Sequence, residues 1–146
     1  MLKDAVIDMK SVCGCGEDKP ETIKFSTDGY YSYEDAVGCL TYEESDVTGM
    51  SGTRTSVIVM PDCVVVDRDG SISSRMIFRE GEKSSFLYDT PYGQTTMGIS
   101  TRKIKHSFNE TGGHVDIDYV MDFDHKVATR NRFSINVKKS GERNNA

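Results

Sequence analysis

The sequence predicts an all-β fold, an antiparallel up-and-down β-barrel of about eight to ten strands. Apolar and polar residues alternate in run after run, as in strands that bury one face, and no stretch has the period of a convincing helix. Turn residues recur about every 8 to 12 residues, so the connections are short. Because short connections let successive strands pair in sequence order, an up-and-down barrel is favoured over a Greek-key sandwich.

The N-terminal part of the chain contains three predicted strands. Residues Lys3–Val12 alternate loosely, and the following run Cys13–Pro20 consists of turn residues. Strand character resumes over Thr22–Tyr33, where Asp28-Gly29 predicts a bulge or kink. The run Val37–Tyr42 is apolar enough to be a buried strand.

Four more strands are predicted in the middle of the chain, after a polar loop at residues 43–52. They are Thr53–Met60, Cys63–Asp67, Ser74–Glu80 and Ser85–Thr90. The sequence Arg68-Asp-Gly70 predicts a tight turn, because aspartate-glycine between two apolar runs is a strong hairpin signal. In the third of these strands, Met76 and Phe78 share one side, and Arg75 lies on the other.

The strand that leaves the Pro91-Tyr92-Gly93 corner has a break in its alternation. Its apolar residues Met97 and Ile99 have odd numbers, whereas Ile104 and His106 have even numbers. One inserted residue between them restores a continuous buried face, which predicts a β-bulge. A bulge bends a strand, and bending helps a sheet to close.

The last two strands alternate most clearly. Apolar residues at odd positions of Val115–Phe123 are separated by aspartates, and Phe133–Val137 alternates next to Arg130 and Arg132. We expect the outer aspartates of one strand to face the outer arginines of the next, which helps to set the register. The aspartates also admit a cation site, but alternation spreads them along one exposed face, so an arginine-paired surface is favoured.

Length and composition indicate one domain over residues 1–138, followed by a flexible C-terminal tail at residues 139–146. The formal net charge of -5 argues against a nucleic-acid binder, which needs lysine and arginine to neutralise phosphates. No apolar run approaches the roughly 20 residues of a membrane helix, and the start of the chain lacks a signal-peptide core. We therefore expect a cytoplasmic protein that binds neither nucleic acid nor membrane.

The four cysteines do not predict a disulfide framework or a metal site. Cys13 and Cys15 lie in a glycine-rich turn with exposed thiols, and Cys39 and Cys63 stand alone among apolar neighbours as small buried residues. A structural zinc site needs two cysteine pairs at wider spacing, or histidines for the remaining ligands, and the three histidines are scattered. No cofactor is predicted.

Several short motifs occur together in one order along the chain. They are Gly49–Thr53, Arg68–Met76, Thr90–Gly93, Met97–Thr101 and Asn131–Val137. In this order and spacing they resemble the YwiB-like family, a bacterial family of domains of unknown function. The resemblance covers nearly the whole chain and implies a lipocalin-like (calycin) β-barrel, in agreement with the periodicity, but it implies no particular activity. The Cys13–Gly16 turn is not part of the family pattern.

The first functional hypothesis is non-enzymatic binding of a small, partly apolar or anionic ligand inside the barrel. Candidate lining residues are Tyr88, Tyr92, Met97, Tyr119, Met121 and Phe133. Arg75 is the candidate cation for an anionic group of the ligand, and Thr101 is a candidate hydrogen-bond donor. The alternatives are simple core filling by the apolar residues and an outer-face position for Arg75.

A second hypothesis is an interaction module that binds a cytoplasmic protein through its outer surface, with Tyr30, Tyr31 and Tyr33 as an exposed cluster. The favoured alternative for these tyrosines is half-buried packing within their strand. A homodimer through an edge or the barrel mouth belongs to this class. An enzyme is the third and least favoured hypothesis, since the sequence has no nucleophile elbow and no phosphate-binding loop before a helix. No catalytic residue is predicted; His106, on the inferred buried face, is the histidine to mutate first.

Overall fold

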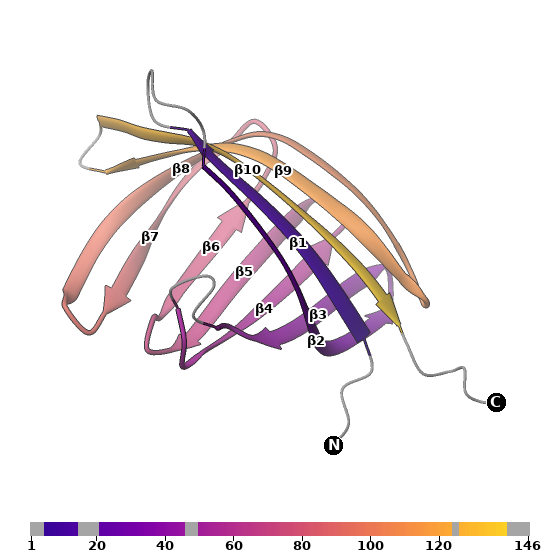
Figure 1. Cartoon of the computed structure of the whole chain (residues 1–146). Coiled ribbons are helices and arrows are strands. Elements are labelled where there is room, and N and C mark those ends of the chain that lie inside the picture. The colour runs from indigo at the N-terminus through magenta and orange to yellow at the C-terminus, as the bar shows by residue number, and fades with distance from the viewer. Residues whose placement is uncertain (1–4, 15–20, 46–49, 124–125, 140–146) are drawn as a thin grey trace.

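The structure is a computed structural model that describes residues 5–14, 21–45, 50–123 and 126–139, without the side chains of residues 123 and 126–128 (Figure 1). These residues form ten strands and no helix. The strands are β1 (Ala5–Gly14), β2 (Glu21–Glu34), β3 (Val37–Glu43), β4 (Thr53–Met60), β5 (Cys63–Gly70), β6 (Ser74–Phe78), β7 (Lys83–Thr90), β8 (Gly93–Asn109), β9 (Gly112–Phe123) and β10 (Lys126–Lys139). No helix able to span a membrane occurs in this part of the chain.

The strands form one antiparallel sheet in the order β6-β5-β4-β3-β2-β1-β10-β9-β8-β7. Every neighbouring pair is consecutive in sequence except β1 and β10, which bring the two ends of the chain together. The predicted all-β up-and-down barrel is therefore confirmed. Lys139 is the last residue of β10, although the prediction assigned it to the tail, and residues 140–146 lie outside the described residues.

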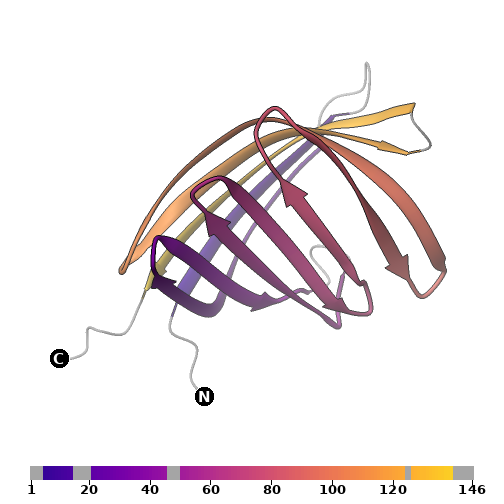
Figure 2. The ribbon, with the colours of Figure 1, turned by 180° about the vertical axis from the view of Figure 1, so that it is seen from behind.

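The barrel is nearly closed, and its seam lies between β6 and β7. In the described residues this seam has no ladder, only the isolated bridge between Ser73 and Asp89 and a hydrogen bond from Ser84 Oγ to the Ile77 carbonyl at 3.0 Å. Figure 2 shows β3 to β6 crossing the strands of the opposite wall. The two walls thus enclose a common interior.

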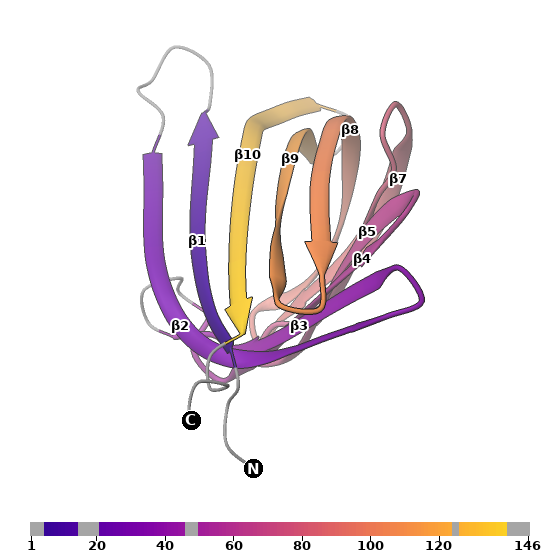
Figure 3. The same ribbon diagram turned by 90° about the vertical axis from the view of Figure 1, so that its right-hand side faces the viewer.

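Strand β2 joins the two walls by bending at Gly29. Its first part pairs with β1 up to the match of Gly29 with Ala5, and from Tyr30 onward it pairs with β3. A Cβ atom on Gly29 would lie 2.3 Å from the carbonyl oxygen of Thr41, so only glycine allows this close approach. Figure 3 shows β2 curving from the wall that contains β1 into the wall that contains β3. The change of partner at Gly29 agrees with the predicted kink.

The predicted bulge in β8 is confirmed, because the register with β9 shifts between Thr101 and Lys103. The predicted burial of His106 is wrong: its side chain is exposed, although it lies opposite the buried Val115. Strand β8 pairs with β7 only up to Ser100. Beyond Ser100, this edge of β8 has no strand partner among the described residues. The bulge restores the inward direction there, but the open edge leaves the imidazole in solvent.

The predicted turn at Arg68-Asp-Gly70 is also wrong, because β5 continues to Gly70, which lies opposite Thr53 of β4. A Cβ on Gly70 would meet the Gly52 carbonyl oxygen at 2.2 Å, so this glycine permits a close strand approach. The aspartates of β9 and the arginines of β10 match at one place, where Asp118 lies opposite Arg132. Asp116 instead accepts a hydrogen bond from Ser134.

The packed core occupies one end of the barrel. The inner residues at this end are mostly β-branched or leucine, and they are almost fully buried: Ile7, Leu40, Val57, Val59, Val64, Val115, Ile117, Ile135 and Val137. Such residues fill space densely and exclude water. Further along β1, β3, β5 and β9, the inner positions pass from this core to residues such as Met9, Tyr42, Arg68 and Tyr119, which line the other end.

Candidate functional site

The other end of the barrel is hollow and contains a pocket of about 460 Å³, here called the barrel pocket. It is lined by Met9, Ser11, Ile23, Phe25, Tyr42, Glu44, Met50, Val66, Arg68, Met76, Phe78, Phe86, Tyr88, Met97, Tyr119, Met121 and Phe133. These residues come from both walls and from both sides of the seam. The barrel is therefore filled at one end and hollow at the other.

Aromatic rings form one side of the barrel pocket. Phe78 packs edge-on against Tyr119 with ring centroids 4.9 Å apart, and Tyr119 meets Phe133 in a T-shaped contact at 6.5 Å. Edge-to-face contacts hold rings in defined positions. Phe78 is only 1% exposed, so this side is anchored in the packed core.

Methionines supply much of the remaining apolar lining. Five of the seven methionines in the chain line the barrel pocket: Met9, Met50, Met76, Met97 and Met121. Methionine side chains are unbranched and polarizable, so they adapt to apolar groups of different shape. The barrel pocket thus combines a fixed aromatic side with an adaptable one.

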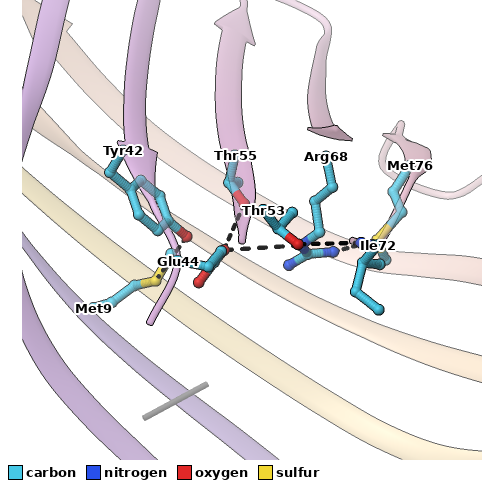
Figure 4. Close-up of polar contacts among 8 residues, drawn as sticks. All are labelled: Met9, Tyr42, Glu44, Thr53, Thr55, Arg68, Ile72 and Met76. Carbon is cyan, nitrogen blue, oxygen red and sulfur yellow. Dashed lines mark hydrogen bonds and ion pairs between the residues drawn. The ribbon is translucent and has the colours of Figure 1, made fainter. Parts of the chain in front are cut away.

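A buried ion pair provides the polar part of the barrel pocket (Figure 4). The Glu44 carboxylate accepts a hydrogen bond from Thr55 Oγ1 at 2.5 Å and lies 3.9 Å from Arg68 Nε. The side chain of Glu44 is 1% exposed and that of Arg68 is 17% exposed. Thr55 lies directly between Tyr42 of β3 and Arg68 of β5 in the register, so the sheet itself brings these groups together.

The Arg68 guanidinium lacks a strong acceptor among the described residues. Its Nε atom is buried with no hydrogen-bond partner there, and its Nη1 donates only to the Met76 thioether sulfur, at 3.5 Å. Thioether sulfur is a weak acceptor, and a buried donor without a partner costs free energy. This guanidinium is therefore able to donate to a bound molecule.

The hydroxyls of Tyr42 and Tyr119 in the barrel pocket stay protonated at neutral pH. Burial raises the pKa of Tyr42, and the Glu44 charge raises it further, against a smaller opposing effect of Arg68. Burial raises the pKa of Tyr119 to about 12, with Arg68 again acting in the opposite direction. The Tyr42 hydroxyl donates to the Met9 sulfur at 3.3 Å. These phenols are donors and do not act as bases.

Five of the eight sequence-predicted site residues meet at this site: Tyr88, Met97, Tyr119, Met121 and Phe133. The other three do not line the barrel pocket: Thr101 is buried elsewhere, Tyr92 is 98% exposed at the corner, and Arg75 is exposed opposite Asp67. Arg75 points outward because its neighbours in sequence, Ser74 and Met76, take the inner positions of β6.

Sequence reasoning missed the charged pair because it placed Arg68 in a turn and Glu44 in a loop. The signal was present in the alternation. The inner positions of β5 continue from Val64 and Val66 to Arg68, and those of β3 continue from Leu40 to the residue beyond the strand end, Glu44. Continuing the alternation by two residues, from Tyr42 to Glu44 and from Val66 to Arg68, identifies both side chains as inner residues.

The outer surface offers less concentrated chemistry. A hollow of about 940 Å³ lies over β1, β2, β9 and β10, and most of its lining is polar or charged. There His114 Nε2 lies 2.9 Å from Asp116 Oδ2, and Ser134 donates to the same carboxylate. Burial of Asp116 tends to raise its pKa, but these two hydrogen bonds lower it below the usual value. Because serine and histidine both bond the aspartate, the histidine does not activate the serine as a catalytic triad requires.

The predicted tyrosine and cysteine positions are only partly as expected. Tyr31 is 3% exposed and its hydroxyl donates to the Asn109 carbonyl oxygen at 2.5 Å, and Tyr30 and Tyr33 are half-buried, so the structure shows packed tyrosines in place of an exposed cluster. Cys63 is buried, whereas Cys13 and Cys39 are half-buried, and Cys15 lies outside the described residues. Within the described residues, no three histidine, cysteine or acidic side chains gather as a metal site would require.

Comparison with known proteins gives one consistent result. A sequence profile described as a domain of unknown function (DUF1934) matches residues 7–135. The chain is 30% identical, over 102 residues, to the uncharacterized beta-barrel protein YwiB of Bacillus subtilis (strain 168), covering 69% of this chain and 70% of that protein. The crystal structure of the ywiB protein superposes with a TM-score of 0.83 at 23% identity, covering 94% of this chain and 92% of the other. At that identity the superposition shows a shared fold.

Proposed function

The chain belongs to the DUF1934 family of beta-barrel proteins, and from this premise we propose that it is a binding protein that holds a small, partly apolar molecule in the barrel pocket. One observation carries the proposal: the barrel is packed at one end and hollow at the other, and the hollow end contains the Arg68 guanidinium, whose buried Nε has no hydrogen-bond acceptor among the described residues. A protein that needed only a core would gain stability by filling this space.

The size and chemistry of the barrel pocket support this proposal. Its volume of about 460 Å³ is within the range of small-molecule sites, about 300 to 1,000 Å³. Such sites are mostly apolar, with a few polar groups that fix the orientation of the ligand. Aromatic rings and methionines supply the apolar part here, and Arg68 with the tyrosine hydroxyls supplies the polar part.

Binding without catalysis is part of the proposal. Within the part of the chain that the structure describes, Glu44 is the only carboxylate lining the barrel pocket, and it is already engaged by Thr55 and Arg68, so it is poorly placed to act as a general base. The described lining residues include no histidine or cysteine. The cytoplasmic location and the lipocalin-like (calycin) relationship stay predictions.

A thermal-shift screen against a panel of metabolites tests the proposal. A ligand that binds only the folded state raises the melting temperature by mass action. The matched control is Ser11→Phe, which places a large side chain in the barrel pocket and should abolish the shift. No shift with any metabolite, or equal shifts in both proteins, would contradict binding at this site.

An interaction module that acts through the outer surface is the second candidate. It is favoured by the hairpin of β7 and β8, where Leu87 is 49% exposed and Tyr92 at the tip is 98% exposed. Exposed tyrosines are frequent at the centre of protein interfaces. Light scattering and pull-down with the wild type and with Leu87→Ser/Tyr92→Ser test it: a self-association or a captured partner that survives the double substitution counts against this surface.

A further inference from the structure

We propose that the barrel pocket selects an uncharged ligand, one with a carbonyl-type acceptor at Arg68 and an apolar body, and that it discriminates against the corresponding carboxylate. This inference rests on the proposed function and specifies its ligand class. The expectation from sequence, in which an anionic ligand meets a free cation, depended on Arg75. That side chain lies outside the barrel, so Arg68 is the only cation among the described residues that line the barrel pocket.

The charges that line the barrel pocket cancel. Among the described residues the lining includes one cation, Arg68, and one anion, Glu44, and every other described lining residue is formally uncharged. The two charges are 3.9 Å apart, and the Glu44 side chain is 1% exposed, so solvent does little to screen it. A ligand carboxylate at Arg68 would bring a second negative charge next to Glu44 with no second cation to balance it.

The hydrogen-bonding needs of the two partners are unequal. Glu44 already accepts a hydrogen bond from Thr55 and lies against Arg68. Arg68 has a buried Nε without a partner in the described residues, and a thioether as the only acceptor at Nη1. The barrel pocket therefore lacks a hydrogen-bond acceptor at Arg68, whereas the charges of its described residues are already balanced. A neutral amide, ester or ketone oxygen provides that acceptor and leaves the charge balance unchanged.

The apolar surroundings fit the remainder of such a ligand. The edge-to-face rings of Phe78, Tyr119 and Phe133 offer a flat contact for an aromatic or alicyclic body. Methionines such as Met76, which also contacts Arg68, adapt to its outline. The ligand class is thus an uncharged molecule with a compact apolar body and a carbonyl head group.

A matched pair of probes tests this selectivity: naphthamide and naphthoate, which share one ring system and differ in the charge of the head group. Isothermal titration of the wild-type protein at neutral pH should show the amide binding at least about tenfold tighter, since each tenfold step requires only about 1.4 kcal/mol. A wild-type protein that prefers naphthoate would overturn the inference and leave the binding function standing. A protein that binds neither probe would contradict both, because the barrel pocket is large enough for this ring system.

Glu44→Gln extends the test by removing the negative charge with little change in shape. Arg68 is then unbalanced, so the preference should reverse toward naphthoate. The control is Glu43→Gln on the outer face of the same strand end, whose carboxylate is exposed and should leave the preference unchanged. An unreversed preference in a folded Glu44→Gln protein would overturn the inference. If Glu44→Gln does not fold, the wild-type comparison still decides it.

Discussion

Glu44→Gln should lower the free energy of unfolding by about 3 kcal/mol, because it leaves the Arg68 guanidinium buried without its counter-ion. At their separation of 3.9 Å and an effective dielectric constant of about 20, the pair attracts by about 4 kcal/mol. The 17% exposure of Arg68 reduces this attraction through solvent screening, so a value near the lower end of the range for buried pairs is expected.

The same reasoning predicts that the pair adds little net stability. Burying each ion costs several kcal/mol, which offsets most of the attraction. Glu44→Gln/Arg68→Met should therefore be within about 1 to 2 kcal/mol of the wild type, although each single variant loses more. This pattern means that the pair is kept for a reason other than stability, as a role in ligand recognition requires.

Urea denaturation of the four proteins in a double-mutant cycle measures the coupling between the two side chains. The control cycle is Glu43→Gln with Arg54→Met, whose ion pair is closer, at 2.9 Å, but 52% and 65% exposed. Its coupling should stay below about 1 kcal/mol. The reasoning would be refuted by equal coupling in the two cycles, or by a double variant that loses as much as the two single variants combined.

Three further outcomes follow from the fold. Phe78→Ala should lower the free energy of unfolding by about 3 to 5 kcal/mol in urea melts, because the ring is 1% exposed and joins the core to the barrel pocket. Gly29→Ala should cost about 1 to 3 kcal/mol in the same assay, because the new Cβ meets the Thr41 carbonyl oxygen at 2.3 Å. Stability should fall as pH rises from about 10 through 12, since burial raises the pKa of Tyr31 and of Tyr119 to about 12. In that window the unfolded chain releases protons that the folded protein keeps, so unfolding becomes more favourable.

Each of these outcomes has a control. Tyr92→Ala removes a ring that is 98% exposed and should change stability by less than about 0.5 kcal/mol, unlike Phe78→Ala. Gly14→Ala places its Cβ 3.8 Å from the nearest atom and should be neutral or slightly stabilising, unlike Gly29→Ala. Tyrosinate absorbance during the alkaline titration should report three tyrosines, Tyr31, Tyr42 and Tyr119, that ionise only as the protein unfolds. Ionisation of every tyrosine before unfolding would contradict the third outcome.

Alternation in the sequence was enough to predict the fold. The period of two identified the strands, short connections implied neighbour pairing, and the change of parity between Ile99 and Ile104 located the bulge that the register confirms. The failure at Gly70 has a physical cause. Aspartate-glycine is a turn signal in local terms, but pairing of β5 with β4 keeps this segment extended. The hydrogen bonds between β4 and β5 therefore outweigh the turn preference of Asp69 and Gly70.

The site was harder to predict than the fold. The same alternation that places Met76 and Phe78 inside also places Arg75 outside. Arg68 is recognised as an inner residue only when β5 is extended to Gly70. Whether inner side chains fill a barrel depends on the distance between its walls, which a one-dimensional pattern does not contain. The sequence contains one sign of the hollow end: the inner residues of the filled end are mostly valine, isoleucine and leucine, whereas those of the hollow end are mostly methionine and aromatic residues.

Native mass spectrometry of the protein purified from its own host tests the central claim most directly. The proposed function predicts a mass above that of the 146-residue polypeptide, lost on denaturation and absent from the Ser11→Phe protein. The released molecule should be small and uncharged, with a carbonyl group and an apolar body. A bare polypeptide mass in the native wild-type spectrum, under conditions that preserve non-covalent complexes, would contradict the claim and direct attention to the outer surface.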